Sequence, residues 1–210
     1  MATKRIAVLG GPRCGKTTLI QHLYVEMKIS GLDVGYALEY STEYLKDKGM
    51  IETIAEQYGI YLGQKKIEDD LSDFEYALTD YATFVPYIYG RFMLGDKKRS
   101  KKEIQILKDL YCLAIEDIQN YDMIIHVPRE FGYVQDGVRW QDEEIALKID
   151  EAILSFLKAE NVNYIQVKGS TKDRAQQILE LLDIDYKETT LLNVSKNEEI
   201  TYYNKCYGDN

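Results

Sequence analysis

One stretch near the start of the chain constrains the fold more than any other. Residues 10–17, Gly-Gly-Pro-Arg-Cys-Gly-Lys-Thr, match the Walker A pattern in full. The apolar run at 6–9 before them is typical of a buried strand, and residues 18–24 after them have the apolar spacing of a helix. A strand on one side and a helix on the other is the setting in which this pattern binds phosphate. The sequence therefore predicts a phosphate-binding loop that joins a strand to a helix.

The spacing within this loop suits a triphosphate. Gly10 and Gly15 let the chain curl, so we expect the backbone N–H groups from about Gly11 to Thr17 to point at phosphate oxygens. A helix that starts at Lys16 adds its positive end, and Lys16 itself should reach the β- and γ-phosphates. The Thr17 hydroxyl should bind Mg²⁺. The predicted nucleotide-binding residues here are Gly10, Gly11, Pro12, Arg13, Cys14, Gly15, Lys16, Thr17 and Thr18. The alternative is a glycine-rich turn with an accidental Lys-Thr pair.

Composition limits the classes to which the chain can belong. Its 210 residues, 45% of them hydrophobic, can bury one core, which predicts a single domain. No apolar run approaches the ~20 residues of a membrane span and the first strand leaves no room for a signal peptide, so we expect a soluble, cytoplasmic protein. Cys14, Cys112 and Cys206 lack metal-type spacing, and Cys112 is expected in the core. The formal charge of −9 argues against a surface built to grip nucleic acid.

Strands and helices alternate along the rest of the chain. Further strands are expected at 34–38, 74–79, 122–128 and 164–167, and helices at 51–69, 82–92, 100–120, 145–157 and 171–182. This alternation predicts an α/β fold over residues 1–182, with a five-stranded, mainly parallel sheet flanked by helices. The tail at 183–210 could form a hairpin from 189–194 and 199–203.

Two local assignments complete this description of the helices. Ser41 or Thr42 is expected to cap a helix after the second strand. The apolar face of the helix at 51–69 is assigned to Ile51, Ile54, Ala55, Tyr58 and Leu62.

Two acidic residues stand at the carboxyl ends of predicted strands, where ligands of parallel sheets bind. The apolar residues before Asp80 resemble a Walker B strand, so we assign Asp80 to magnesium, through a bound water, or to the role of general base. It could instead cap the next helix. Glu39 is then left to face a second substrate, unless it is a solvated loop acid.

The polar, aromatic stretch at 129–142 has no clear period and is predicted to be a lid. Its Arg129 and Arg139 would supply the cations that phosphoryl transfer needs, while closure would exclude water. Arg139 could instead form a structural salt bridge with Asp136 or Asp142.

Two more segments bear on the ligands. After the last strand, Gly169 and Arg174 are expected beside the phosphate loop, where this segment could frame a purine base. The absence of an Asn-Lys-x-Asp sequence favours ATP over GTP. The basic run at 97–102 is either a solvated helix end or a site for one strand of DNA.

Four segments together resemble a known family. Residues 10–18, 39–44, 79–80 and 136–139 are similar, in this order, to segments of P-loop kinases and of phage or bacterial AAA-type ATPases related to the nicotinamide riboside kinase domain. The resemblance implies a P-loop NTPase fold like that of the nucleoside monophosphate kinases, with a lid, ATP as donor and magnesium. It also implies an acceptor pocket near Glu39, Tyr40 and Glu43, and a lid arginine at Arg139. The chain departs from the pattern at Leu78, where riboside kinases carry aspartate, which argues against nicotinamide riboside as acceptor.

The sequence thus predicts an ATP- and Mg²⁺-dependent kinase that acts on a hydroxyl or phosphate of a nucleoside, nucleotide or similar small acceptor. Similar phage kinases act on nucleotides or on modified pyrimidines in DNA, so a modified base or an end of DNA stays open as acceptor. With 26 basic against 35 acidic residues, the charge balance favours the small acceptor. The alternative of another class is a nucleotide-gated ATPase or switch that transfers nothing. The oligomeric state stays open.

Overall fold

A computed structural model of the chain describes residues 2–94, 100–130 and 143–185. The strands are β1 (Lys4–Leu9), β2 (Val34–Ala37), β3 (Tyr76–Asp80), β4 (Met123–His126) and β5 (Ile165–Gln166). The helices are α1 (Lys16–Ile29), α2 (Tyr40–Lys48), α3 (Ile54–Asp69), α4 (Val85–Leu94), α5 (Lys101–Asp117), α6 (Glu143–Ala159) and α7 (Thr171–Leu181), with a 3-10 turn at Ile118–Asn120. Most of the predicted lid, with Arg139, lies outside the described residues, as do the start of the basic run and the proposed tail hairpin.

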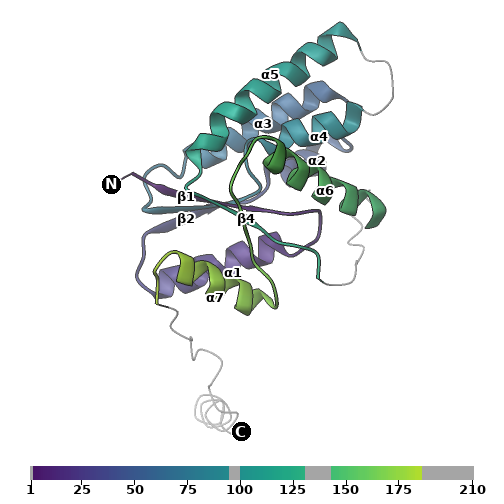
Figure 1. The fold of residues 1–210 in the computed structure, drawn as a ribbon. Helices are drawn as coiled ribbons and strands as arrows, with labels where there is room; N and C mark the ends of the chain where they lie inside the picture. Colours follow the sequence, from purple (N-terminus) through teal and green to yellow (C-terminus); the bar gives the residue numbers. More distant parts are fainter. Residues whose placement is uncertain (1, 95–99, 131–142, 186–210) are drawn as a thin grey trace, which may run out of the picture.

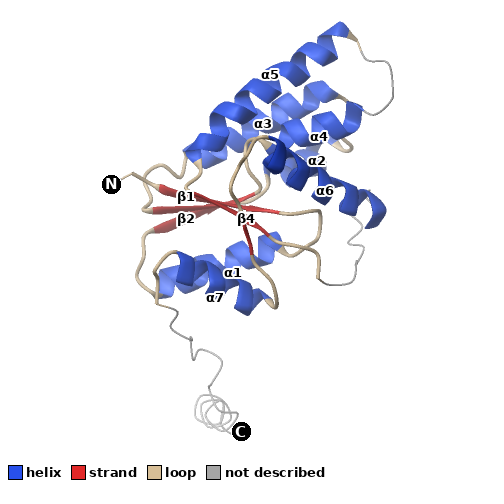
Figure 2. Ribbon diagram, in the orientation of Figure 1, coloured by secondary structure: helices blue, strands red, loops and turns tan. Residues whose placement is uncertain are grey.

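The five strands form one sheet in the order β2-β3-β1-β4-β5, and every pair is parallel. Helices cover both faces of the sheet, with α1 and α7 against one face and α2 to α6 on the other (Figures 1 and 2). This confirms the predicted α/β fold with a five-stranded parallel sheet flanked by helices.

The pattern of β1 explains why both faces are covered. Ile6 and Val8 belong to the core beneath α1 and α7, whereas Ala7 and Leu9 belong to the core beneath α4 and α6. All four side chains are fully buried. Because successive side chains of a strand point to opposite faces, an uninterrupted apolar strand needs helices on both sides.

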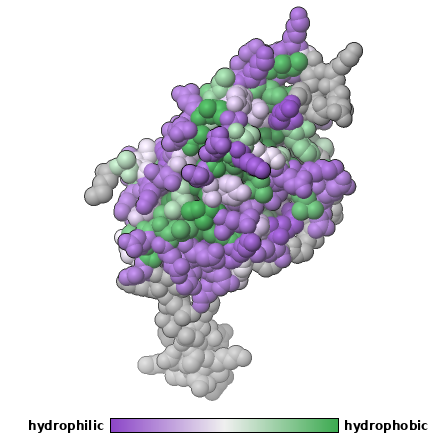
Figure 3. Space-filling model, in the orientation of Figure 1, coloured by the Kyte–Doolittle hydropathy of each residue, from purple (hydrophilic) through white to green (hydrophobic). Residues whose placement is uncertain are grey.

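The face of the molecule turned to the viewer in Figure 3 is largely hydrophilic, with apolar residues in separate patches. In the described part of the chain, no helix is long and apolar enough to cross a membrane.

The register of the central strands sets the position of the site. Val8 of β1 is level with Asp80 of β3, and Leu9 is level with His126 of β4. The phosphate loop follows Leu9 directly, and Glu39 lies two residues beyond the end of β2. The loop and the two predicted acids therefore meet at one edge of the sheet.

Helix α1 begins differently from the helices on the surface. α3, α5 and α7 each begin with a capping box, formed by Thr53, Ser100 and Ser170. α1 has Gly15 at its N-cap, with φ of 94° and no side-chain cap. A left-handed glycine in this place turns the chain into the helix and directs the first N–H groups of α1 toward a ligand rather than toward a capping side chain.

Some local predictions are wrong. Tyr58 and Leu62 of α3 are 38% and 51% exposed, because the buried face of this helix includes Gln57 and Gln64 instead. Cys112 is exposed on α5, whose buried face carries other residues. α2 begins at Tyr40 with Glu39 in the N-cap position, so neither Ser41 nor Thr42 caps it.

Candidate active site

The phosphate loop holds Lys16 in a buried position. The side chain is 4% exposed, and its Nζ donates to the carbonyl oxygen of Gly11 at 3.0 Å. The same nitrogen lies 4.5 Å from the centre of the Tyr81 ring. A carbonyl oxygen and the negative face of an aromatic ring both stabilise a desolvated ammonium group. The predicted lysine therefore lies inside the loop, with its ammonium group next to the ring of Tyr81.

Thr17 and Asp80, which the sequence predicted as magnesium ligands, are in contact. The Thr17 hydroxyl donates to Oδ2 of Asp80, and Asp80 is 1% exposed at the carboxyl end of β3. Hydroxyl and carboxylate oxygens are the hard donors that Mg²⁺ prefers, so these two residues fit that ion. Asp80 does not cap the next helix, because α4 begins five residues later at Val85.

Arg174 of α7 supports the backbone of the phosphate loop. It is 1% exposed, and its guanidinium donates to the carbonyl oxygens of Cys14 at 3.0 Å and Pro128 at 3.2 Å. It also contacts the carboxylate of Glu130 at 2.8 Å, which in turn accepts the Gly169 N–H at 2.7 Å. The hydrogen bond from Arg174 lowers the pKa of Glu130. Arg174 thus joins the loop, the start of the predicted lid and the segment before α7.

Arg129 also contacts the loop, donating to the carbonyl oxygen of Pro12. Arg129 and Arg174 therefore both bind the backbone of the loop in this structure.

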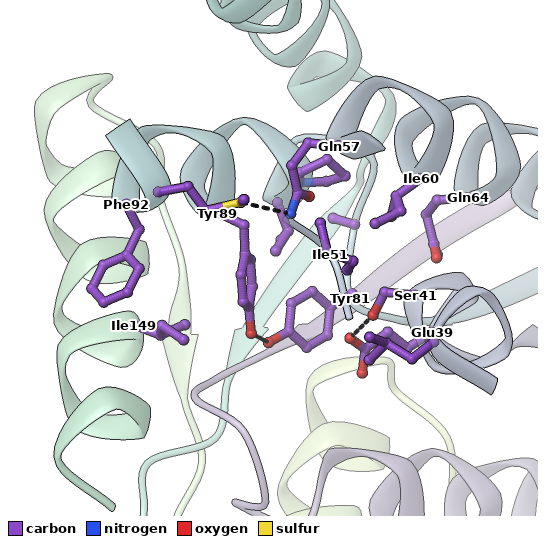
Figure 4. Close-up of a pocket in the computed structure, with 15 residues that line it drawn as sticks. Glu39, Ser41, Ile51, Gln57, Ile60, Gln64, Tyr81, Tyr89, Phe92 and Ile149 are labelled. Carbon is purple, nitrogen blue, oxygen red and sulfur yellow. Dashed lines mark hydrogen bonds between the residues drawn. The ribbon is translucent and has the colours of Figure 1, made fainter. Parts of the chain in front are cut away.

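A pocket adjoins the loop on the side of α3 and α4 (Figure 4). Its polar side chains come from the helices α2, α3 and α4, from the residue that precedes α2 and from the turn after β3, and its remaining wall is apolar. The polar lining residues are Glu39, Ser41, Gln57, Gln64, Tyr81 and Tyr89, and the apolar ones include Leu45, Ile51, Ile60, Val85, Pro86, Phe92, Met93 and Ile149. Glu39 is the only charged side chain among the described residues that line it.

Of the three residues predicted to bind the acceptor, Glu39 lines this pocket. It is 8% exposed, and the Ser41 hydroxyl donates to its Oε1 (Figure 4). Tyr40 and Glu43 are not among the described lining residues. The Tyr40 ring packs against Gly63 of α3, and Glu43 pairs with Lys46 at 2.7 Å on the exposed side of α2.

Two buried glutamines in this pocket escaped the sequence prediction. Gln57 and Gln64 are 3% and 2% exposed. The amide nitrogen of Gln64 donates to Glu68 at 2.8 Å, and its amide oxygen accepts the Tyr40 N–H at 2.9 Å. Their separation of two helical turns was the available signal, since residues seven apart share a helix face.

Tyr81 forms the border between the loop and the pocket. Its φ is 75°, and its carbonyl oxygen accepts the Thr79 hydroxyl at 2.9 Å. Its own hydroxyl lies 2.8 Å from that of Tyr89, and the two point at each other inside the pocket (Figure 4). A left-handed conformation in a bulky residue costs about 1–3 kcal/mol and tends to occur at functional sites. The side chain of Tyr81 therefore contacts Lys16 through its ring and also lines the pocket.

Asp150 of α6 is a further residue at the loop that sequence reasoning missed. Its Oδ1 accepts the Gly11 N–H at 2.6 Å. The sequence predicted that this N–H would point at phosphate, and in this structure it is bonded to a carboxylate instead.

The strand order, the loop after β1, the acid after β2 and the acid that ends β3 define a P-loop protein with a nucleoside and nucleotide kinase fold. A family model described as an AAA domain matches residues 5–174, and the chain belongs to this AAA-domain family. No curated protein matches the sequence.

Solved structures share the fold at low identity. The NadR protein in complex with NR has a TM-score of 0.72 and 16% identity over 89% of this chain and 54% of that one. Deoxyadenosine kinase from M. mycoides has a TM-score of 0.60 and 16% identity over 85% and 98%. Thymidylate kinase from Candida albicans has a TM-score of 0.58 and 13% identity over 87% and 92%. The chain spans about half the length of the NadR structures, 54% and 51%. These likenesses confirm the predicted resemblance and fold.

Proposed function

We propose that the chain is an ATP- and Mg²⁺-dependent kinase that transfers the γ-phosphate of ATP to a hydroxyl of a nucleoside or a similar uncharged small molecule. One observation carries the proposal: the pocket beside the phosphate loop has Glu39 as the only charged side chain among its described lining residues. A phosphate on the acceptor would call for cations in the lining. An apolar wall with a few amides and hydroxyls suits a base and a sugar. The pocket therefore favours a nucleoside over a nucleotide or a DNA strand.

The names of the structural neighbours do not decide between a nucleoside and a nucleotide as acceptor. One is solved in complex with NR and another is named a deoxyadenosine kinase, while a third is a thymidylate kinase. Because their identity to this chain is 13–16%, they support the kinase fold and leave the acceptor to the argument from the pocket.

The residues at the loop would bind the donor. Lys16 would exchange the Gly11 carbonyl for β- and γ-phosphate oxygens, and the N–H groups at the start of α1 would bind the same phosphates. Thr17 and Asp80 would hold Mg²⁺, which neutralises charge on the phosphates when bound. Their mutual contact makes the metal the better of the two roles predicted for Asp80. Arg174 and Gly169 would lie beside the base of ATP.

Glu39 would act on the acceptor. In the transfer, the acceptor hydroxyl gives its proton to Glu39 while its oxygen bonds to the γ-phosphorus. The bond from that phosphorus to the bridging oxygen of ADP breaks at the same time. Ser41 orients the carboxylate through its hydroxyl hydrogen bond. Arg139 and Arg129 would stabilise the charge on the transferring group, as the sequence predicts for the lid.

A labelled-phosphate assay tests the proposal. The protein is incubated with Mg²⁺ and ATP labelled at the γ-phosphate, and with nucleosides, nucleoside monophosphates or an oligonucleotide with a free 5′ hydroxyl. We expect label on one or more nucleosides, and none with Lys16→Ala. Label found only in inorganic phosphate across the panel would favour an ATPase or switch. Label on the monophosphates or on the oligonucleotide alone would contradict the argument from the pocket.

A further inference from the structure

A chain of hydrogen bonds runs from the edge strand β5 to the phosphate loop. The amide nitrogen of Gln166 lies 3.0 Å from Nδ1 of His126 on β4, and Nε2 of His126 lies 3.0 Å from Oδ1 of Asp150 on α6. The same carboxylate oxygen accepts the N–H of Gly11. His126 is 1% exposed, so this imidazole has been placed inside the protein at the carboxyl end of a strand beside the site.

The carboxylate of Asp150 determines which group donates and which accepts in each of these hydrogen bonds. An ionised carboxylate only accepts hydrogen bonds, so Nε2 of His126 must carry the hydrogen that faces Asp150. In a neutral ring Nδ1 is then an acceptor, and the amide N–H of Gln166 donates to it. In this arrangement each of the three hydrogen bonds between Gln166 and Gly11 has one donor and one acceptor. The imidazole thus holds the carboxylate in place.

Helix α6 is in close contact with the loop at the same point. A Cβ built on Gly11 would lie 2.7 Å from the carbonyl oxygen of Ala146 and 3.1 Å from Cβ of Asp150. Only glycine leaves room for a helix backbone so close. The neighbour of Asp150, Ile149, is 1% exposed and lines the acceptor pocket. One turn of α6 therefore touches both the loop and the pocket.

We propose that Asp150 is a positioning residue for nucleotide binding, oriented by His126 and Gln166. By holding the Gly11 peptide, it fixes the start of the loop whose later N–H groups and lysine bind the phosphates. Because α6 follows the segment 131–142 in the chain, it also ties the helix after that segment to the loop. The inference rests on nucleotide binding at the loop, which is part of the proposed function, and does not depend on which acceptor is used.

Binding measurements separate this role from a structural one. Calorimetric titration with Mg²⁺ and the ATP analogue AMP-PNP would compare the wild type with Asp150→Ala, Asp150→Asn and the neighbouring exposed control Glu151→Ala. Asp150→Ala removes the acceptor of the Gly11 N–H, and the loss of a hydrogen bond to a charged group should weaken binding roughly tenfold or more. The asparagine oxygen still accepts, so Asp150→Asn should stay within about threefold of the wild type. Glu151→Ala should change nothing.

The outcomes are distinct. If the wild type binds and Asp150→Ala binds equally well, this inference is wrong while the proposed function stands. Tighter binding by both Asp150 variants would also overturn it, because the carboxylate would then be a competitor of the phosphates. A wild type that binds no nucleotide would overturn the proposed function and this inference together.

Nitrogen NMR of the histidines gives a second test that needs no ligand and no substitution of Asp150, His126 or Gln166. The chain has two histidines, His22 and His126, so the signals of His126 can be assigned with a single His22→Gln variant. We expect the neutral form of His126 to carry its hydrogen on Nε2. A hydrogen on Nδ1 alone would contradict the arrangement, because a lone pair would then face the carboxylate of Asp150.

Discussion

A buried glutamate beside the acceptor pocket makes the free energy of unfolding depend on pH. Glu68 of α3 is 2% exposed, and its two carboxylate oxygens accept hydrogen bonds from Gln64 at 2.8 Å and from the Tyr121 hydroxyl at 2.7 Å. Burial raises the pKa of Glu68 to about 7, although the hydrogen bonds from Tyr121 and Gln64 and the nearby charge of Arg5 act to lower it. In the native protein this carboxyl group is therefore mostly protonated below about pH 7.

The sign and size of the effect follow from this pKa. The ordinary pKa of the carboxyl group is 4.5, so between pH 4.5 and about 7 the native state holds a proton that the unfolded chain has released. The free energy of unfolding then falls as pH rises through this window. Each pH unit between the two pKa values is worth about 1.4 kcal/mol, so the ionised carboxylate destabilises the fold by about 3 kcal/mol above pH 7. Below pH 4.5 the carboxyl group is protonated in both the native and the unfolded state, so it does not change the free energy of unfolding with pH.

Replacing Glu68 with glutamine should remove this dependence. The amide has the same size and remains neutral, so Glu68→Gln should stabilise the protein by up to about 3 kcal/mol at pH 8 and change little at pH 5. Urea unfolding followed by circular dichroism, at intervals from pH 5 to 8.5, measures the difference between variant and wild type. Glu151→Gln on the exposed side of α6 is the control. Parallel curves for the wild type and Glu68→Gln would refute the assigned pKa.

Three further predictions concern the site. Lys16→Ala should abolish nucleotide turnover, a loss of several kcal/mol of transition-state stabilisation, and unchanged turnover would refute the assignment of the loop. Asp80→Asn should lower kcat far more than ATP affinity, whereas Glu39→Gln should raise the KM of the acceptor and also lower kcat, because Glu39 both faces the acceptor and takes its proton; a rise in the acceptor KM found only in Asp80→Asn would mean that the two strand ends have the opposite roles. Arg139→Ala should lower kcat on the order of 10²-fold with ATP binding and melting temperature nearly kept, whereas a structural arginine would lower the melting temperature and spare kcat per folded molecule.

The parts of this site that lie at strand ends could be predicted from the sequence. The Walker A pattern fixes a strand before it and a helix after it, and the uninterrupted apolar run of β1 requires helices on both faces. Once the sheet is parallel, the residues at the carboxyl end of each strand must lie at the same edge as the loop. That is why Thr17 and Asp80 could be expected to meet, although they are 63 positions apart.

The pocket could not be predicted in the same way. A single sequence shows hydropathy, and hydropathy places Tyr58 and Leu62 inside and Gln57 and Gln64 outside, which is the reverse of the structure. Buried amides are stable only because partners such as Glu68 satisfy them, and those partners cannot be read from the local pattern. Asp150 is hidden for the same reason, since its partner Gly11 is 139 positions away.

Residues that contact both the phosphate loop and the pocket couple the binding of ATP to the binding of the acceptor molecule. Tyr81 touches Lys16 with its ring and meets Tyr89 in the pocket with its hydroxyl, and α6 presents Ile149 to the pocket and Asp150 to the loop. A substitution that reshapes the pocket through Tyr81 or Ile149 therefore also shifts a group that contacts the phosphate loop. Changes in acceptor preference should be easier to obtain at positions that line the pocket away from this border, such as Gln57 and Phe92, because these are not in contact with the loop residues that hold the phosphates.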